Sequence, residues 1–236
     1  MIGFQTSINN ELSLLEELKF AMEHKIPVFD IFFDRWLPSD ITEEEFALIH
    51  KIQVEESLFF TVHLPIEYHS LSNSVKKSFF EFLNDIKPKT TTVHFDKITI
   101  DELQTLYNAV NSVTKISIEN TIPDTNCENY LKYLEKAKSV GTIYATIDAG
   151  HGFVNGIEPD ILAQKIAQLG ITIATFHAHD NDGKKDMHLP VGEGTIKFDK
   201  LFAELKKQNA NPYIVIEHWD NNLKSYKNLR TLKDNA

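Results

Sequence analysis

Cysteine is almost absent from the sequence, and the single thiol, Cys127, excludes a disulfide within the chain. Because proteins of oxidising compartments commonly use disulfides, this scarcity favours a reducing compartment. Long apolar runs are absent too, since none approaches the roughly 18 residues that span a bilayer. The N-terminal MIGFQTS lacks the pattern of a signal peptide. Together these absences predict a cytoplasmic protein with no segment inserted in a membrane.

Basic residues are scarce relative to acidic ones. The chain has 24 Lys and Arg against 34 Asp and Glu, a formal net charge of −10 at pH 7. Because a basic face is the usual footprint of nucleic-acid binding, this balance argues weakly against nucleic acid as a partner. It leaves room for a local cationic groove, or for bound metal ions that offset the acidity.

Low-complexity linkers and breaks in composition are absent from the 236 residues, which are 42% hydrophobic and 25% charged. This is the composition of an ordinary globular protein, and such a chain is long enough to bury a sizeable core. We therefore expect residues 1–236 to form a single domain.

Short runs rich in Ile, Val, Thr and Phe alternate eight times with longer amphipathic segments. The runs are apolar over most of their length, as strands covered on both faces are. They begin at Ile2, Val28, Phe59, Thr90, Lys115, Ile143, Ile173 and Tyr213. Eight strand–helix pairs with short connections predict a parallel sheet closed into a (β/α)8 barrel, that is, an α/β TIM barrel. The alternative is an open doubly wound sheet, but neither early strand leads into a GxGxxG phosphate fingerprint.

Ionisable side chains end six consecutive strand-like runs, the third to the eighth. They are His63, His94, Glu119, Asp148 with His151 three residues on, His177 with His179 just beyond, and Glu217. In a (β/α)8 barrel the active site forms at the C-terminal ends of the strands, so these side chains would converge on one mouth. Burying so many carboxylates and imidazoles without a cation would leave uncompensated charge. The pattern therefore predicts a site for divalent metal.

A loop dense in histidine, aspartate and glycine follows the seventh run. Residues 177–194 read HAHDNDGKKDMHLPVGEG and add Asp186 and His188 to the candidate ligands. On its own this stretch also fits a polar surface loop. With no thiolate in the set, Zn²⁺, Mn²⁺, Co²⁺, Fe²⁺ and Mg²⁺ all suit it, and the abundance of imidazole favours zinc or manganese. We expect Asp180 and Asp182 to orient His177 or His188 by hydrogen bonds.

Three further residues are candidates for contact with a substrate. Arg35 could bind a phosphate, Trp36 could stack on a sugar ring, and His179 lies beside His177.

The strand-end motifs resemble those of a known group. SIENT (117–121), TIDAGH (146–151), FHAHDNDGKKDMHLPVGEG (176–194) and VIEHW (215–219) are similar to the xylose-isomerase-like TIM-barrel superfamily. That group holds sugar-phosphate isomerases and epimerases, and also abasic-site nucleases of the endonuclease IV type, AP endonuclease family 2. The resemblance covers nearly the whole chain.

The isomerase and epimerase members imply one divalent metal held by four residues, which by motif are Glu119, Asp148, His177 and Glu217. The resemblance further implies a small sugar or sugar-phosphate substrate and a metal-stabilised enediolate. By this resemblance Glu119 would be the general base and Glu217 the general acid. Dimers or tetramers are common among these relatives, so a homo-oligomer is expected.

The nuclease members imply three zinc ions and nine ligands. Here His63, His94, Glu119, Asp148, His151, His177, Asp186, His188 and Glu217 each fall on a matching position. Against this reading, Gln5 stands where the nucleases have a His-containing segment, and FFDRWLPSD lacks an arginine-rich DNA-contacting loop. The sequence thus favours a sugar isomerase or epimerase, with a metallo-phosphodiesterase second and a non-catalytic metal- or sugar-binding barrel third. The number of bound metal ions, between one and three, distinguishes the first two of these functions.

Overall fold

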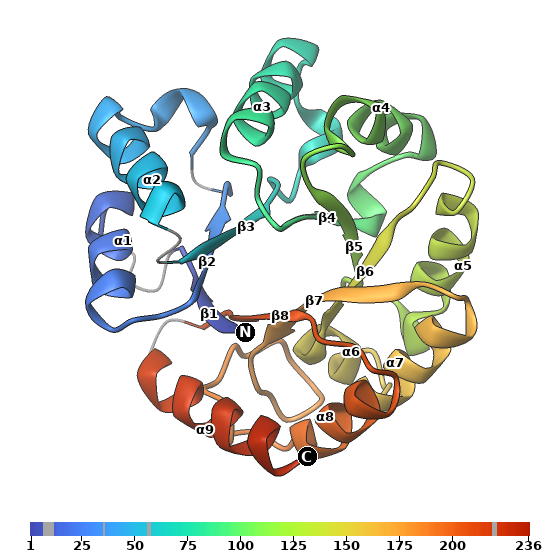
Figure 1. Ribbon diagram of the computed structural model, residues 1–236. Helices are drawn as coiled ribbons and strands as arrows, with labels where there is room; N and C mark the ends of the chain where they lie inside the picture. Colours follow the sequence, from blue (N-terminus) through green and yellow to red (C-terminus); the bar gives the residue numbers. More distant parts are fainter. Residues whose placement is uncertain (7–11, 35, 56–57, 219–220) are drawn as a thin grey trace.

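The computed structural model describes residues 1–6, 12–34, 36–55, 58–218 and 221–236. Within them, eight parallel strands close into a barrel in chain order and helices surround it (Figure 1). The strands are β1 (Ile2–Gln5), β2 (Val28–Phe32), β3 (Phe59–His63), β4 (Thr90–His94), β5 (Lys115–Glu119), β6 (Tyr144–Asp148), β7 (Thr172–Ala178) and β8 (Tyr213–Ile216). The predicted (β/α)8 barrel is confirmed.

The helices form an outer ring around the strands (Figure 1). They are α1 (Leu14–Glu23), α2 (Glu43–Glu55), α3 (Asn73–Ile86), α4 (Ile100–Val110), α5 (Glu128–Ala137), α6 (Ala149–Val154), α7 (Pro159–Gln168), α8 (Phe198–Lys207) and α9 (Asn222–Asn235). The start of α4 illustrates how local sequence sets an end. Thr99 accepts from the Glu102 backbone N–H, and the Glu102 carboxylate accepts from the Thr99 backbone N–H. This reciprocal pair is the capping box that a T-x-x-E pattern forms.

Strand register brings the predicted ligands level with one another. His94 on β4 lies opposite Glu119 on β5, and Asp148 on β6 lies opposite His177 on β7. Because parallel strands all point the same way, these C-terminal residues gather at one end of the barrel. The register therefore builds the predicted mouth.

A layer of hydroxyl side chains fills the barrel directly beneath the ligands. Its members stand two residues before a strand-end ligand and are fully buried: Thr61, Thr92, Ser117, Thr146 and Thr175. Three of them bond to one another, Thr146 to Thr92 at 3.2 Å and to Ser117 at 2.6 Å, while Thr61 donates to Asp30 and Thr175 to Thr90. Barrel interiors are commonly filled by branched apolar residues. Here the mouth rests on a floor of satisfied polar groups.

The short helix α6 is an element that the strand–helix pattern does not predict. It starts directly after β6, where the Asp148 carboxylate accepts from the His151 backbone N–H at 2.6 Å. This cap fixes His151 one turn beyond Asp148, so that both side chains face the mouth.

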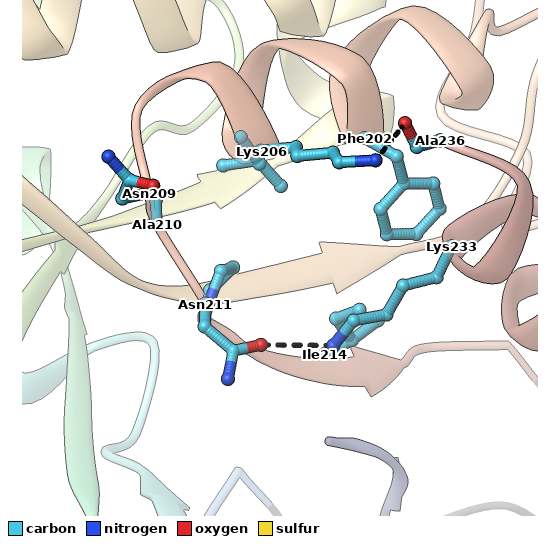
Figure 2. A pocket seen from close by; sticks show the side chains of 10 residues that line it. Phe202, Lys206, Asn209, Ala210, Asn211, Ile214, Lys233 and Ala236 are labelled. Atoms are coloured by element: carbon cyan, nitrogen blue, oxygen red, sulfur yellow. Dashed lines mark hydrogen bonds between the residues drawn. The ribbon is translucent and has the colours of Figure 1, made fainter.

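A cavity of about 350 Å³ lies away from the mouth, between α8, α9 and the start of β8 (Figure 2). Lys206 donates to the Ala236 carbonyl and Lys233 to the Asn211 side chain, so the two cations beside the cavity already have partners. None of the helices in the described ranges is both long and apolar enough to cross a membrane.

Candidate metal centre

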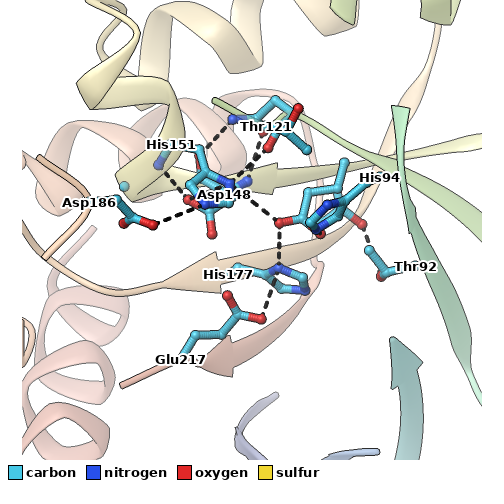
Figure 3. A network of polar contacts seen from close by, with 12 residues as sticks. Thr92, His94, Thr121, Asp148, His151, His177, Asp186 and Glu217 are labelled. Atoms are coloured by element: carbon cyan, nitrogen blue, oxygen red, sulfur yellow. Dashed lines mark hydrogen bonds and ion pairs between the residues drawn. The ribbon is translucent and has the colours of Figure 1, made fainter. Parts of the chain in front are cut away.

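Glu119 lies at the middle of a buried cluster of imidazoles. Its Oε2 is 2.8 Å from His63 Nε2 and 3.6 Å from His94 Nε2. Its Oε1 is 3.1 Å from His177 Nδ1, and His177 Nδ1 is also 3.1 Å from Glu217 Oε1. Figure 3 shows His177 reaching toward Glu217 on one side and toward the rest of the network on the other. The Glu119 side chain is 1% exposed, so its charge must be balanced by neighbours rather than by water.

All nine residues expected from the strand ends and the loop converge, and together with His179 they form three groups; within each group the ligand atoms lie within 4.8 Å of one another. The first group is His63, His94 and Glu119. The second group is Glu119, Asp148, His177 and Glu217, and the third group is His151, His179, Asp186 and His188. Glu119 belongs to both the first and the second group. If each group held a cation, Glu119 would be a ligand of both.

Three of the imidazoles share one orienting contact, in which Nδ1–H donates to a backbone carbonyl. The pairs are His63 to Leu64 at 2.7 Å, His151 to Asn120 at 3.1 Å and His188 to Glu217 at 2.6 Å. A histidine that ligates metal almost always donates its other ring N–H in this way. The contact turns Nε2 of each ring toward the cluster.

The carboxylates of the cluster have shifted acidities. Burial alone would raise the pKa of Glu119, but His177, His94 and His63 hold it well below its usual value. The pKa of Asp148 falls to about 2 because His151 and His179 outweigh its burial. For Glu217, burial and then the charges of Glu119 and Asp148 raise the pKa well above the ordinary range.

The pKa values of the imidazoles also shift in opposite directions. Burial lowers the pKa of His94 to about 3. Burial also opposes the charge on His151, yet Asp148, Asp186 and Glu119 raise its pKa to about 10. The surroundings of His151 therefore favour a positive charge, whereas burial of His94 disfavours a proton on that ring.

The donor atoms fit a divalent cation. Three deeply buried ones, His177 Nε2, His179 Nδ1 and Asp186 Oδ1, have no hydrogen-bond partner among the described residues. A buried polar atom without a partner costs roughly 1–3 kcal/mol, so the cluster would be strained unless ions complete it. Imidazole nitrogen and carboxylate oxygen without thiolate are ligands for zinc or manganese.

The three residues predicted to contact substrate lie in different surroundings. Arg35 lies outside the described residues. Trp36 packs its ring against Phe33, with centroids 5.7 Å apart, and lines a surface cleft with Leu14 and Glu45. His179 is fully buried among the ligands. A role in binding substrate stays a prediction for all three.

Sequence reasoning missed Asn120 and Gln5. The Asn120 side chain donates to the Asp148 carbonyl and accepts from the Asp148 N–H, both at 2.9 Å, while its own carbonyl accepts from His151. The Gln5 amide donates to Glu217 Oε1. Asn120 follows a predicted ligand directly, and Gln5 ends β1, so the strand-end rule extended to amides would have found both.

The expectation that Asp180 orients a histidine is wrong. Its carboxylate accepts backbone N–H groups of the loop instead, from Asn181 at 3.0 Å, Gly192 at 2.9 Å and Ile196 at 3.1 Å. Loop amides nearby in sequence and space outcompete the more distant imidazoles for this carboxylate.

A parallel (β/α)8 barrel whose C-terminal mouth carries side chains able to hold divalent cations defines the class of this protein. The family follows from comparison with known proteins. The model of the xylose isomerase-like TIM barrel family matches residues 77–235, and the chain belongs to that family. The resemblance carried by the strand-end motifs is confirmed.

Individual relatives agree with this assignment. An uncharacterised protein of Methanocaldococcus jannaschii, MJ1614, is 27% identical over 184 residues, which cover 68% of this chain and 71% of the relative. The crystal structure of a D-tagatose 3-epimerase-like protein has a TM-score of 0.80 at 20% identity, covering 99% of this chain and 97% of its own. That of a 3-keto-D-glucoside 4-epimerase from E. coli has a TM-score of 0.71 at 18% identity, covering 100% and 99%. At these identities the structural likeness establishes the fold alone.

Proposed function

We propose that the protein is a hydrolase of phosphodiesters that works with three divalent cations, zinc being favoured. The observation that carries the proposal is the third group, because Asp186 and His188 come together with His151 and His179 beside the other two groups. A mononuclear isomerase needs only the second group. On this ground we rank the hydrolase first and the isomerase or epimerase, which the sequence favours, second.

Neighbouring divalent cations polarise phosphoryl oxygens and lower the pKa of water, which is the chemistry of multi-metal hydrolases. Side chains of the protein itself shape the site for these cations. Glu119, with its depressed pKa, stays ionised and offers one oxygen to each of two groups. Gln5 donates a hydrogen bond to one oxygen of Glu217, and the layer of hydroxyl side chains beneath the mouth is fully buried.

The substrate expected is a small phosphodiester rather than duplex DNA. The net charge of −10 and the single arginine in FFDRWLPSD offer little to grip a long polyanion. The cytoplasmic location and a homo-oligomeric assembly remain predictions alongside this one.

One specific observation supports a second candidate, a sugar or sugar-phosphate isomerase or epimerase. The second group supplies four buried ligands by itself, and its two glutamates have pKa values shifted in opposite directions, that of Glu119 lowered by its histidine neighbours and that of Glu217 raised by burial. Two carboxyl groups whose pKa values are moved apart suit the abstraction and return of a proton. The low pKa of Glu119 makes it a weak base, which places this function second.

Metal analysis with two activity panels tests the choice. Purified protein loaded with Zn²⁺ is expected to hold three ions per chain and to cleave bis(p-nitrophenyl) phosphate. It is expected to exchange no substrate C–H proton in D₂O with ketoses or ketose phosphates. One ion per chain together with C–H exchange would refute the hydrolase and establish the isomerase. Three ions with neither activity would leave only a binding barrel.

Substrate size is tested separately with an abasic-site duplex beside the small diester. Faster cleavage of the duplex would overturn the preference for small substrates while leaving the hydrolase intact.

A further inference from the structure

The described ends of β1 and β2 bring no member of the three groups to the mouth. Each strand from β3 to β8 ends in, or directly beside, a residue of those groups. By contrast, β1 ends in Gln5, whose amide donates to Glu217, and β2 ends in Phe32. One side of a mouth that is otherwise charged thus carries an aromatic ring, and the candidate metal centre gives that ring no role.

The Phe32 side chain points into the mouth. Side chains alternate along a strand, so Phe32 faces the same way as Asp30, whose carboxylate accepts from Thr61 inside the barrel. Phe32 pairs in register with His63, and the two rings lie with centroids 4.8 Å apart and planes at 76°. The phenyl ring therefore occupies on β2 the level that candidate ligands occupy on the neighbouring strands.

The ring is fixed at its base but only partly covered. The Phe32 N–H donates to the Thr6 hydroxyl at 2.9 Å, and that hydroxyl donates to the Phe32 carbonyl at 3.3 Å. Ile31 and Phe33 on either side are buried in the core, whereas Phe32 is only half-buried. A fixed aromatic surface left open beside a candidate ligand suits contact with an apolar part of a bound substrate.

The surroundings of Phe32 favour a flat, unsaturated ring over a polyhydroxylated one. The phenyl side chain has no polar atom, and two nearby donors are already engaged. The Gln5 amide nitrogen donates to Glu217, and the Thr6 hydroxyl donates to the Phe32 backbone. Sugar hydroxyls placed here would give up hydrogen bonds to water without equivalent replacements, which costs affinity. A flat ring would instead gain contact by stacking.

We propose that Phe32 is a specificity-determining residue that contacts a flat, unsaturated ring on one arm of the substrate diester. This inference rests on the proposed hydrolase and deepens it by naming the class of arm, either an aryl group or a nucleobase. The first group contains His63, so a phosphoryl group bound over the first group brings one arm beside the Phe32 ring.

The test is equilibrium binding to zinc-loaded protein, measured by calorimetry with two pairs of probes. Phenylphosphonate and methylphosphonate differ by an aryl ring, whereas uridine 5′-monophosphate and ribose 5-phosphate differ by a base. In at least one pair the probe with the ring is expected to bind about 10-fold more tightly. Phe32→Ala is expected to abolish this preference and Phe32→Tyr to retain it. A preference confined to the first pair identifies an aryl arm, and one confined to the second pair identifies a nucleobase.

The absence of a preference in both pairs would overturn the proposal, as would a preference that survives in Phe32→Ala. Phe80→Ala is the matched control, because Phe80 is a half-buried ring on the outer helix α3, and it is expected to keep the preference. Zinc content is expected to be the same in Phe32→Ala as in the unaltered protein, which separates loss of stacking from displacement of His63.

A crystal structure of the unaltered protein with the tighter probe needs no variant to fold. The ring of the probe is expected to lie against Phe32, and a ring bound elsewhere would refute the inference. Neither measurement depends on turnover. Absence of diester cleavage would therefore overturn the proposed function and leave the ring preference standing, whereas cleavage without the preference would do the reverse.

Discussion

Glu119 is the residue on which the first and second groups both depend. We expect Glu119→Gln to reduce bound zinc from three ions to one, because the neutral amide bridges poorly. Losing an orienting partner alone typically costs 10–100-fold in affinity or activity, so loss of a bridging ligand is expected to lower diester cleavage by more than about 100-fold. Metal analysis and initial rates measure both effects.

Glu135→Gln is the matched control, because Glu135 pairs with Lys138 on the exposed face of α5. It is expected to keep three ions and full activity. A Glu119→Gln variant that keeps three ions would show that the carboxylate is not a bridge.

Cys127 tests the packing beside the centre. Burial raises the pKa of its thiol to about 12, and Asn155 donates to its sulfur at 3.7 Å. The thiolate is the reactive form, so at pH 8 only about one thiol in ten thousand is reactive even where reagent can reach it. We expect no labelling by iodoacetamide in the native protein and one equivalent in urea, counted by mass spectrometry. Rapid native labelling would show that α5 opens readily.

Which residues ligate could largely be read from the sequence, because strand ends of a closed barrel must meet. The orientation of each imidazole ring could not be read from the sequence. The choice between Nδ1 and Nε2 depends on carbonyls such as those of Leu64 and Asn120, whose direction is set by backbone geometry. The hydroxyl layer, by contrast, could have been predicted from the sequence, because Thr or Ser stands two residues before five of the ligands.

At the scale of elements, the loop of residues 177–194 depends on close backbone packing at its end. Asp180 N and O pair with Leu189, and the Asp180 carboxylate accepts from the Gly192 N–H. A Cβ at Gly194 would lie 2.3 Å from Asp180 Oδ1 and 2.4 Å from the Asn181 carbonyl. Only glycine fits there.

We expect Gly194→Ala to displace Asp186 and His188 with the loop, and so to release the third ion while two remain. The measurement is zinc content together with amide hydrogen exchange of the loop. Gly170→Ala is the control, because a Cβ there meets nothing within 4 Å, although its positive φ of 73° adds a small strain. Retention of three ions in Gly194→Ala would mean that the loop does not position the third group.

The sequence predicts where this loop lies but not its internal bonds. A run of His, Asp and Gly has no hydrophobic period, so nothing in it indicates that Asp180 binds loop amides rather than imidazoles. The helix α6 was not predicted for a related reason. At six residues it is too short to show the periodic apolar face that identifies a helix in a sequence.

At the scale of the molecule, candidate ligands from six of the eight strands meet at one mouth, so we expect metal binding and folding to be coupled. Chelation is therefore expected to destabilise the whole barrel rather than one loop. A ligand at 1,000 times its dissociation constant stabilises the folded state by about 4 kcal/mol per site. Thermal unfolding with and without Zn²⁺ is expected to show one cooperative transition that shifts upward with metal. A shift confined to loop signals would contradict the coupling.

The same coupling predicts how stability depends on pH in the metal-free protein. His151 has a folded-state pKa of about 10 against an ordinary value of 6.5, because Asp148 and Asp186 outweigh its burial. A raised pKa contributes stability that is complete below 6.5 and is lost as the pH climbs toward 10. Glu217, whose pKa is also raised, loses its proton and adds to the same decline. Metal-free protein should therefore melt at progressively lower temperature over this range.

Zinc is expected to reverse that trend, because the ion takes the place of the proton on His151 and binds more tightly as protons become scarce. The difference in melting temperature between zinc-loaded and metal-free protein should widen from pH 6.5 to pH 9, below the pKa of about 10 on His151. His151→Gln should flatten the metal-free profile, whereas the exposed His69→Gln should leave it unchanged. A gap that stays constant with pH would mean that the buried imidazole does not exchange a proton for a metal, and the cluster would then be a set of ion pairs.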